Sequence, residues 1–326
     1  MSYLGPDFDP PQPRRARRGP LTVALAALVP GALLGWLVYE AVGGSGASSG
    51  AVGPASPPAT SSTSGSSVRT AAPPATRSGP GTPDAKAPGR KSDAPAPAGS
   101  GPLRGKVVVI DPGHNPGNFQ HTAEINRQVD IGTNRKECDT TGTSTNAGYT
   151  EARFTMDVAQ RLRTILERQG ATVKLTRDAD SPAWGPCVDE RARIGNTARA
   201  DAAISIHADG AAEGDRGYHV ILPGSVHAGA ADTRPITGPS RDLGTRIAGT
   251  FLRATGEPPS NYLGAGTGLV TRTDLGGLNL STVPKVFIEC GNMRDSKDAA
   301  LLTSGAWRQK AAQGISEGIV GFLRQS

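Results

Sequence analysis

From residue 103 onward, the chain alternates short apolar runs with longer amphipathic stretches. Residues 106–111 (Lys-Val-Val-Val-Ile-Asp) have the pattern of a buried strand, and residues 151–169 repeat apolar side chains at helical spacing. Gly170 stands where that helix would end. The same patterns predict strands at 172–176, 202–206, 217–222, 268–272 and 286–289, and helices at 188–199, 241–253 and 305–323. Such alternation predicts an α/β fold, with a sheet covered by helices on both faces.

The chain before residue 103 lacks this alternation and divides into three parts. Residues 1–20 end in a basic cluster, residues 21–42 are apolar with no charge before Glu40, and residues 43–102 are dominated by Gly, Ala, Ser, Thr and Pro. The apolar run predicts a membrane anchor with the N-terminus in the cytoplasm, and a cleaved signal peptide is the alternative. Residues 43–102 offer too little apolar surface to fold, which predicts a disordered linker. We therefore expect residues 103–326 at the outer face of the cytoplasmic membrane, or secreted after cleavage.

Composition and charge narrow the possible partners. Forty-three glycines, 27 prolines and only 4% aromatic residues fit a linker beside one ordinary domain. The net charge is +6, but no Lys/Arg cluster lies beside aromatic residues after residue 103, so we expect no nucleic-acid partner. The chain shows no internal repeat and no second binding module. One catalytic domain acting as a monomer is the expectation.

The expected export of residues 103–326 determines how we interpret the three cysteines. Cys138 and Cys187 lie in Thr/Gly- and Pro-rich segments, whereas Cys290 follows an apolar run and is expected to be buried. An oxidising compartment favours a Cys138–Cys187 disulfide, and two free thiols are the alternative. In the chain-entropy model, closing the loop between these two cysteines would stabilise the folded state by roughly 4 kcal/mol.

Residues suited to metal binding or proton transfer follow three of the predicted strands. His114 comes after Asp111-Pro-Gly, His207 ends Ser-Ile-His, Glu289 ends the strand at 286–289, and Glu151 opens the first long helix. Two imidazoles and a carboxylate form a common catalytic zinc set, and a further carboxylate is the base that metal-assisted hydrolysis needs. Glu151 could instead favour the positive end of its helix, and a histidine at a strand end could be a surface residue. Residue spacing alone leaves both interpretations open.

Four segments resemble one known family. DPGHNPGN around His114, SIHADG around His207, VFIECGNM around Glu289 and the helix-opening Glu151 are similar to the signature segments of the N-acetylmuramoyl-L-alanine amidases of the Amidase_3 type. The resemblance covers essentially all of residues 103–326, and Arg191 and Asn196 match further family positions.

The resemblance implies a fold, a cofactor and a reaction. The fold would be a three-layer zinc-exopeptidase-like (phosphorylase/hydrolase-like) α/β domain with a mostly parallel mixed sheet. His114, Glu151 and His207 would hold Zn²⁺, and Glu289 would be the catalytic acid/base. The substrate would be the amide bond between N-acetylmuramic acid and L-alanine in peptidoglycan.

Other positions are less certain members of the site. Arg272 and Asn292 are expected to contact substrate, although a structural ion pair is an alternative for Arg272. Asn115-Pro116 replaces a pair of glycines found in many members, and Cys290-Gly291-Asn292 replaces a Thr-Gly-Phe type segment. His121, His219 and His227 match no family segment, and Glu124 or Glu137 could replace Glu151 as ligand.

Two rival functions and one regulatory question remain open at this point. Another exported zinc peptidase on the same fold, such as a carboxypeptidase, would use the same residues. A non-catalytic peptidoglycan-binding module would lack a ligand or the base, and here all are present. Residues 208–285 contain one convincing helical pattern, at 241–253, which predicts a site without an autoinhibitory helix.

Overall fold

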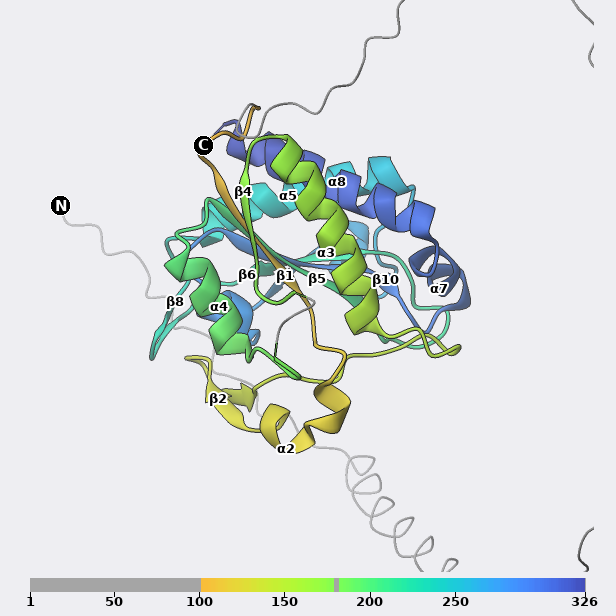
Figure 1. The fold of residues 1–326 in the computed structure, drawn as a ribbon, viewed down its shortest axis with the longest axis horizontal. Helices are drawn as coiled ribbons and strands as arrows, with labels where there is room; N and C mark the ends of the chain where they lie inside the picture. The colour runs from red at the N-terminus through yellow and green to blue at the C-terminus, as the bar shows by residue number, and fades with distance from the viewer. Residues whose placement is uncertain (1–100, 179–181, 326) are drawn as a thin grey trace, which may run out of the picture. The chain divides into compact units, whose positions relative to one another are not determined.

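The computed structural model describes residues 101–178 and 182–325. Its centre is a six-stranded sheet in the order β4-β1-β5-β10-β6-β9 (Figure 1). The first four strands are parallel, β6 is antiparallel to β10, and β9 is parallel to β6. The mostly parallel mixed sheet is therefore confirmed. The strand bounds are β1 (Val107–Pro112), β4 (Thr172–Leu175), β5 (Ala202–Asp209), β6 (His219–Pro223), β9 (Leu269–Arg272) and β10 (Lys285–Asn292).

Side chains alternate between the two faces of this sheet, and helices cover both. Ile110, Ile204 and Ile288 belong to the main apolar core, which also contains residues of α3 (Glu151–Arg168), α5 (Thr237–Thr255) and α8 (Gly305–Leu323). Val109 and Ala203 point to the other face, where they pack with α4 (Val188–Thr197). In Figure 1 the strands run between α4 and α3. The predicted three-layer α/β architecture is thus confirmed.

Helices α5 and α8 approach each other closely. A Cβ built on Gly318 of α8 would lie 2.6 Å from the Ile247 Cα of α5, so a glycine is needed at this contact. Helix α5 also packs on β6. It therefore belongs to the packing of the sheet, as its apolar stripe predicts, although it begins at Thr237, four residues before the predicted start.

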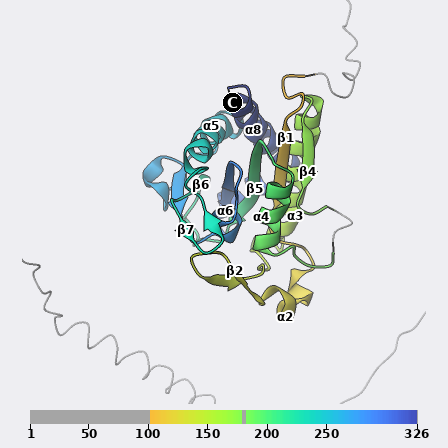
Figure 2. The same cartoon turned by 90° about the vertical axis from the view of Figure 1, so that its left-hand side faces the viewer.

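Short elements gather at the edge of the sheet where β1 ends. Helix α2 (Thr122–Ile125) and the hairpin of β2 (Gln128–Asp130) and β3 (Arg135–Glu137) lie together there (Figures 1 and 2). The predicted disulfide is confirmed: Cys138 and Cys187 are bonded, with 4.3 Å between their Cα atoms. Because Cys187 immediately precedes α4, the bond ties the end of the hairpin to that helix. Cys290 is free and buried, as expected.

The predictions for the N-terminal part fall on residues that the structure does not describe. The tail at 1–20, the apolar run at 21–42 and the linker at 43–102, except for its last two residues, lie outside the described residues. Within the described ranges, each helix is too short or too polar to cross a bilayer. The single-pass localisation at the outer face of the membrane is therefore corrected, because no helix among the described residues could span a membrane.

Candidate metal centre

Three side chains from separate elements converge beside the end of β1. His114 follows β1, Glu151 is the first residue of α3, and His207 lies in β5. One carboxylate oxygen, Glu151 Oε1, lies 3.1 Å from His114 Nε2 and 2.9 Å from His207 Nδ1. The three potential ligand atoms lie within 4.8 Å of one another. The fold thus brings together the three residues that the sequence proposed as ligands, and they could bind a metal ion.

The turn that carries His114 is held from several sides. His114 has a left-handed backbone (φ 56°), a conformation that non-glycine residues adopt mainly when the surroundings impose it. Arg191 of α4 donates from Nη1 to the Pro112 carbonyl at 2.8 Å and from Nη2 to the His114 carbonyl at 3.2 Å. The Thr140 carbonyl lies 3.1 Å from His114 Nδ1 and can only accept. With its proton on Nδ1, bonded to that carbonyl, His114 would present Nε2, which faces Glu151 here, to a metal ion.

Two glycines leave room for the imidazoles. A Cβ on Gly113 would lie 2.3 Å from the His207 ring. A Cβ on Gly142, which has φ of 72°, would lie 2.8 Å from the His114 ring and 2.9 Å from Glu151 Oε2. The main chain is therefore shaped around these three side chains. Two imidazoles and one carboxylate, with a free nitrogen aimed inward, fit a catalytic zinc site.

Charge within this group favours cation binding. Burial alone would raise the pKa of Glu151, but the His114 and His207 imidazoles outweigh it and hold that pKa well below its ordinary value. The main-chain N–H groups of Thr143 and Ala208 donate to the Glu151 carboxylate at 3.0 and 3.2 Å. Burial lowers the pKa of His114, but the charge of Glu151 outweighs this effect, so the pKa lies above its ordinary value. The carboxylate is thus anionic and oriented.

Glu289 lies on the strand next to His207. The two residues are register partners in β10 and β5, and His219 of β6 is the partner of Glu289 on the other side. Among the described residues, Glu289 Oε2 is buried without a hydrogen-bond partner. Burial, followed by the charges of Glu151 and Asp209, raises the pKa of Glu289 well above its ordinary value. This carboxyl group is therefore neither a structural ion pair nor a capping group.

A buried polar network around Asp111 lies next to the turn that carries His114. Asp111 of β1 accepts hydrogen bonds from Thr176 at 2.6 Å, Arg191 at 2.8 Å and Lys285 at 3.2 Å. Burial would raise the pKa of Asp111, but Lys285 and Arg191 lower it well below its ordinary range. The network joins β1, β10 and α4 directly beneath the turn that carries His114.

The remaining candidates from the sequence have other partners. Arg272 forms an ion pair with Asp274 at 2.6 Å. Asn292 is fully buried, and its amide donates to the carbonyls of Ala211, Ala212 and Asp215. Substrate contact by either residue stays a prediction, and the fold already accounts for the side chain of Asn292.

The alternative ligands are not part of the cluster. His121 pairs with Glu124 at 3.5 Å, and His227 lies 3.4 Å from Asp232 at the surface. His219 is buried, and burial lowers its pKa. Glu137 lines a cavity beside the centre but does not belong to the His114 cluster.

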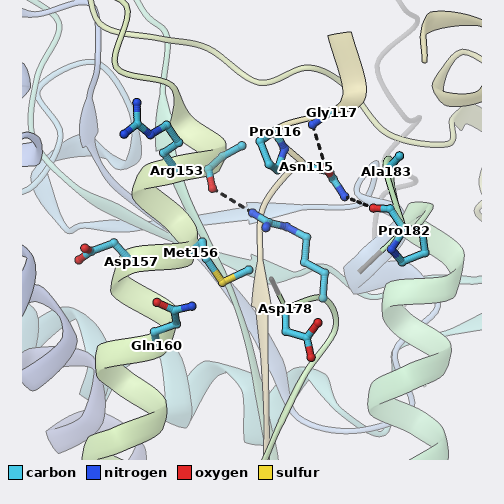
Figure 3. Close-up of a pocket in the computed structure, with 12 residues that line it drawn as sticks. Asn115, Pro116, Gly117, Arg153, Met156, Asp157, Gln160, Asp178, Pro182 and Ala183 are labelled. Atoms are coloured by element: carbon cyan, nitrogen blue, oxygen red, sulfur yellow. Dashed lines mark hydrogen bonds between the residues drawn. The ribbon is translucent and has the colours of Figure 1, made fainter. Parts of the chain in front are cut away.

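Three hollows surround the centre. A charged cavity of about 220 Å³ is lined by His114 and His207 together with Asp111, Gly113, Lys136, Glu137, Asp139, Thr140, Val188, Arg191, Asp274, Leu275, Gly276, Gly277 and Phe287. A groove of about 380 Å³ is lined by Asn115, Pro116, Phe119, Thr141, Gly142, Thr143, Ser144, Thr150 and Ala152. The third, a depression of about 470 Å³, lies along α3 (Figure 3).

The sequence did not predict the residues that contact and orient the candidate ligands. Thr140 and Gly142 lie in a Thr/Gly/Ser-rich stretch that has no regular period, and only the fold reveals their contact with His114. Arg191 was matched to a family position without a role. Its position on a polar face of the helix at 188–199 gave no indication that it is buried.

Comparison with known proteins gives a consistent result. Residues 108–320 match the Amidase_3 family, described as N-acetylmuramoyl-L-alanine amidase. The chain is 44% identical over 223 residues to N-acetylmuramoyl-L-alanine amidase Rv3717 of Mycobacterium tuberculosis, which covers 68% of this chain and 88% of the relative. It is 27% identical to the probable cell wall amidase LytH of Staphylococcus aureus, over 67% of this chain and 58% of that protein.

Solved structures agree with the sequence comparison. The N-acetylmuramyl-L-alanine amidase Ami1 of Mycobacterium smegmatis superposes with a TM-score of 0.63 at 40% identity, covering 70% of this chain and 100% of that chain. Ami1 of Mycobacterium abscessus gives a TM-score of 0.61, also at 40% identity, and covers 67% of this chain and 99% of that chain.

Proposed function

The chain belongs to the N-acetylmuramoyl-L-alanine amidase family, and from that premise we propose that it is a zinc-dependent peptidoglycan amidase. It would hydrolyse the amide bond between N-acetylmuramic acid and L-alanine, with zinc held by His114, Glu151 and His207. The observation that carries the proposal is the convergence of these side chains within 4.8 Å, with Glu289 on the adjacent strand.

Each ligand would be presented in a form suited to the metal. Glu151 is anionic and fixed by two main-chain donors, and His114 has its Nδ1 proton bonded to Thr140, which leaves Nε2 as the donor atom. A bound zinc ion supplies Lewis acidity, which lowers the pKa of water and polarises the amide carbonyl. Three protein ligands would leave coordination positions for water and substrate.

Glu289 is the residue that we propose to move the protons. Its carboxylate would accept a proton from the attacking water and then donate it to the departing amine of L-alanine. Its unpartnered Oε2 supports this role, because a buried carboxyl group without a structural partner is costly unless it is used. The base must lie within hydrogen-bond reach of the water, and the register with His207 brings it to the neighbouring position on the sheet.

The test is product analysis of a defined muropeptide. The full chain should release a free stem peptide that begins with L-alanine, and mass spectrometry should show the glycan without its peptide. A chelator should stop the reaction, and added zinc should restore it. Glu289→Gln should bind zinc normally and lose about 10² to 10⁴-fold or more in rate. Cleavage within the peptide instead, or near-normal activity of the zinc-loaded variant, would contradict the proposal.

A further inference from the structure

The groove that contains Phe119 differs chemically from the cavity that contains His114 and His207. Its described lining residues are all uncharged, and Thr141, Thr143 and Ser144 bring hydroxyl groups to it. The cavity that contains His114 is lined by Lys136, Glu137, Asp139 and Asp274, among others. A substrate that is neutral at one end and charged at the other would therefore have one preferred orientation.

An exposed aromatic ring stands at the edge of the groove. Phe119 lies in the short 3-10 helix Asn118–Gln120 and is 64% exposed, the most exposed large apolar side chain among the described residues. A partner that covers this ring would remove its apolar area from water, which is favourable. The flat apolar face of a phenyl ring matches the C–H face of a pyranose sugar. Phe119 thus has the chemistry of a stacking platform for a carbohydrate.

Hydroxyl groups free to bind sugar lie in the same groove. Thr143 and Ser144 are half-buried. In the described part of the chain, their hydroxyl groups make no hydrogen bond to protein atoms. Gly142, between Thr141 and Thr143, has its backbone against the His114 ring and the Glu151 carboxylate. The groove therefore begins directly beside the metal centre.

The groove continues into the depression along α3. The two hollows share Asn115, Pro116 and Ala152, and Figure 3 shows Met156 and Gln160 on α3 beside the second one. Four charged residues line this depression, and these include Asp157, to which Arg308 donates at 3.0 Å, and Arg177, which donates to the carbonyls of Gly113 and Ala152. The Gln160 amide has no protein partner within the described residues and can bond to a neutral ligand.

We propose that the groove containing Phe119, Thr143 and Ser144 binds the glycan strand of the substrate, with the second depression receiving sugars further along the strand. This inference rests on the proposed function. Peptidoglycan sugars are uncharged once the lactyl group is in amide linkage, whereas a stem peptide carries amino or carboxyl charges. The glycan therefore fits the uncharged groove, the peptide fits the charged cavity, and the scissile amide lies between them at the metal centre.

The test compares two substrates with the same peptide, one on a single N-acetylmuramic acid and one on a strand of several disaccharides. Phe119→Ala should raise KM on the strand by roughly three- to tenfold and raise KM on the single-sugar substrate by less. Gln160→Ala should act in the same direction, and Phe119→Tyr should restore binding. Leu252→Ala on α5 is the matched control, since this side chain is 40% exposed and lies on a helix that lines neither hollow.

A binding measurement separates this inference from the proposed function. Glycan strands whose lactyl groups are capped as simple amides should bind the full-length chain in calorimetry and bind Phe119→Ala more weakly by the same factor, while free stem peptide should bind both equally. If Phe119→Ala weakens binding of the peptide instead, or if the capped strands do not bind, the inference is wrong even when the amidase is active. Failure of the unaltered chain to cleave either substrate would refute the proposed function itself.

Discussion

Single residues around the metal centre act mainly by leaving space and by fixing orientation. Gly113 and Gly142 allow the main chain to touch the two imidazoles, and Thr140 fixes the ring of His114. The family-like segments predicted that His114, Glu151 and His207 come together, because each lies in or beside a segment characteristic of the family. Gly142 could not be predicted, because its importance comes from a positive φ and from a contact with residues far away in sequence.

Gly142→Ala is the sharpest test at this scale. The new methyl group would lie 2.8 Å from the His114 ring and 2.9 Å from Glu151 Oε2, so the ligands must shift. We expect at least a tenfold loss of metal affinity, of the size seen when groups supporting the ligands are altered. Gly148→Ala is the control, because Gly148 also has a positive φ (83°) but has no atom within 4 Å of the added carbon. Equal metal affinity in the two variants, measured by competition with a chromogenic chelator, would show that Gly142 does not shape the site.

At the scale of elements, the sheet brings the candidate ligands together. The residues that follow the hairpin β2–β3 contact His114. The periodic patterns predicted the main strands and helices, but strand direction is not encoded in a short apolar run. Because β6 and β9 run opposite to β10, the end of β9 that carries Arg272 lies level with the start of β10, although the charge of Arg272 still lowers the pKa of Glu289. The hairpin β2–β3 was also not predicted, since its strands are three residues long and mostly exposed.

The disulfide should stabilise the hairpin together with the residues that follow it. Cys138→Ser/Cys187→Ser should lower the free energy of unfolding by about 2 to 5 kcal/mol, because it opens a loop with a sequence separation of 49. Asp139 and Thr140 follow Cys138 directly and contact His114, so metal affinity should fall as well. Urea unfolding of the variant and of the reduced unaltered chain should give the same loss. An unchanged midpoint in both would show that the hairpin is held without the bond.

At the scale of the whole domain, one buried network joins both halves of the sheet. Asp111 contacts groups after β4, in β5 and β10, and in α4, and it lies beneath the metal centre. The sequence showed Asp111 only as the end of a strand before a turn. Its burial and its two cationic partners depend on elements that are 80 and 174 residues away.

The Asp111 network predicts a specific response to acid. The pKa of Asp111 is lower in the folded state than in the unfolded state, so its contribution to stability is complete above the unfolded pKa of about 3.9 and is lost as the pH falls below it. Asp111→Asn should therefore lower the free energy of unfolding by about 3 to 5 kcal/mol at pH 7, as expected for a broken buried pair. Below pH 4, the stability of this variant should depend less on pH than that of the unaltered chain.

Chemical unfolding at pH 7 and between pH 4 and 2 would measure both effects. Asp242→Asn is the control, because Asp242 forms only an exposed pair with Arg246 on α5. The same acid sensitivity in Asp111→Asn and in the unaltered chain would mean that other groups dominate the acid response.

The central claim, a zinc centre built from His114, Glu151 and His207, is tested most directly by diffraction at the zinc absorption edge. Crystals of the zinc-loaded protein should show one anomalous peak, about 2.0 to 2.2 Å from a ligand atom of each of the three side chains. The same map for His207→Ala should show that peak lost or strongly reduced. A peak bound by other residues, or its absence from active zinc-loaded protein, would contradict the account.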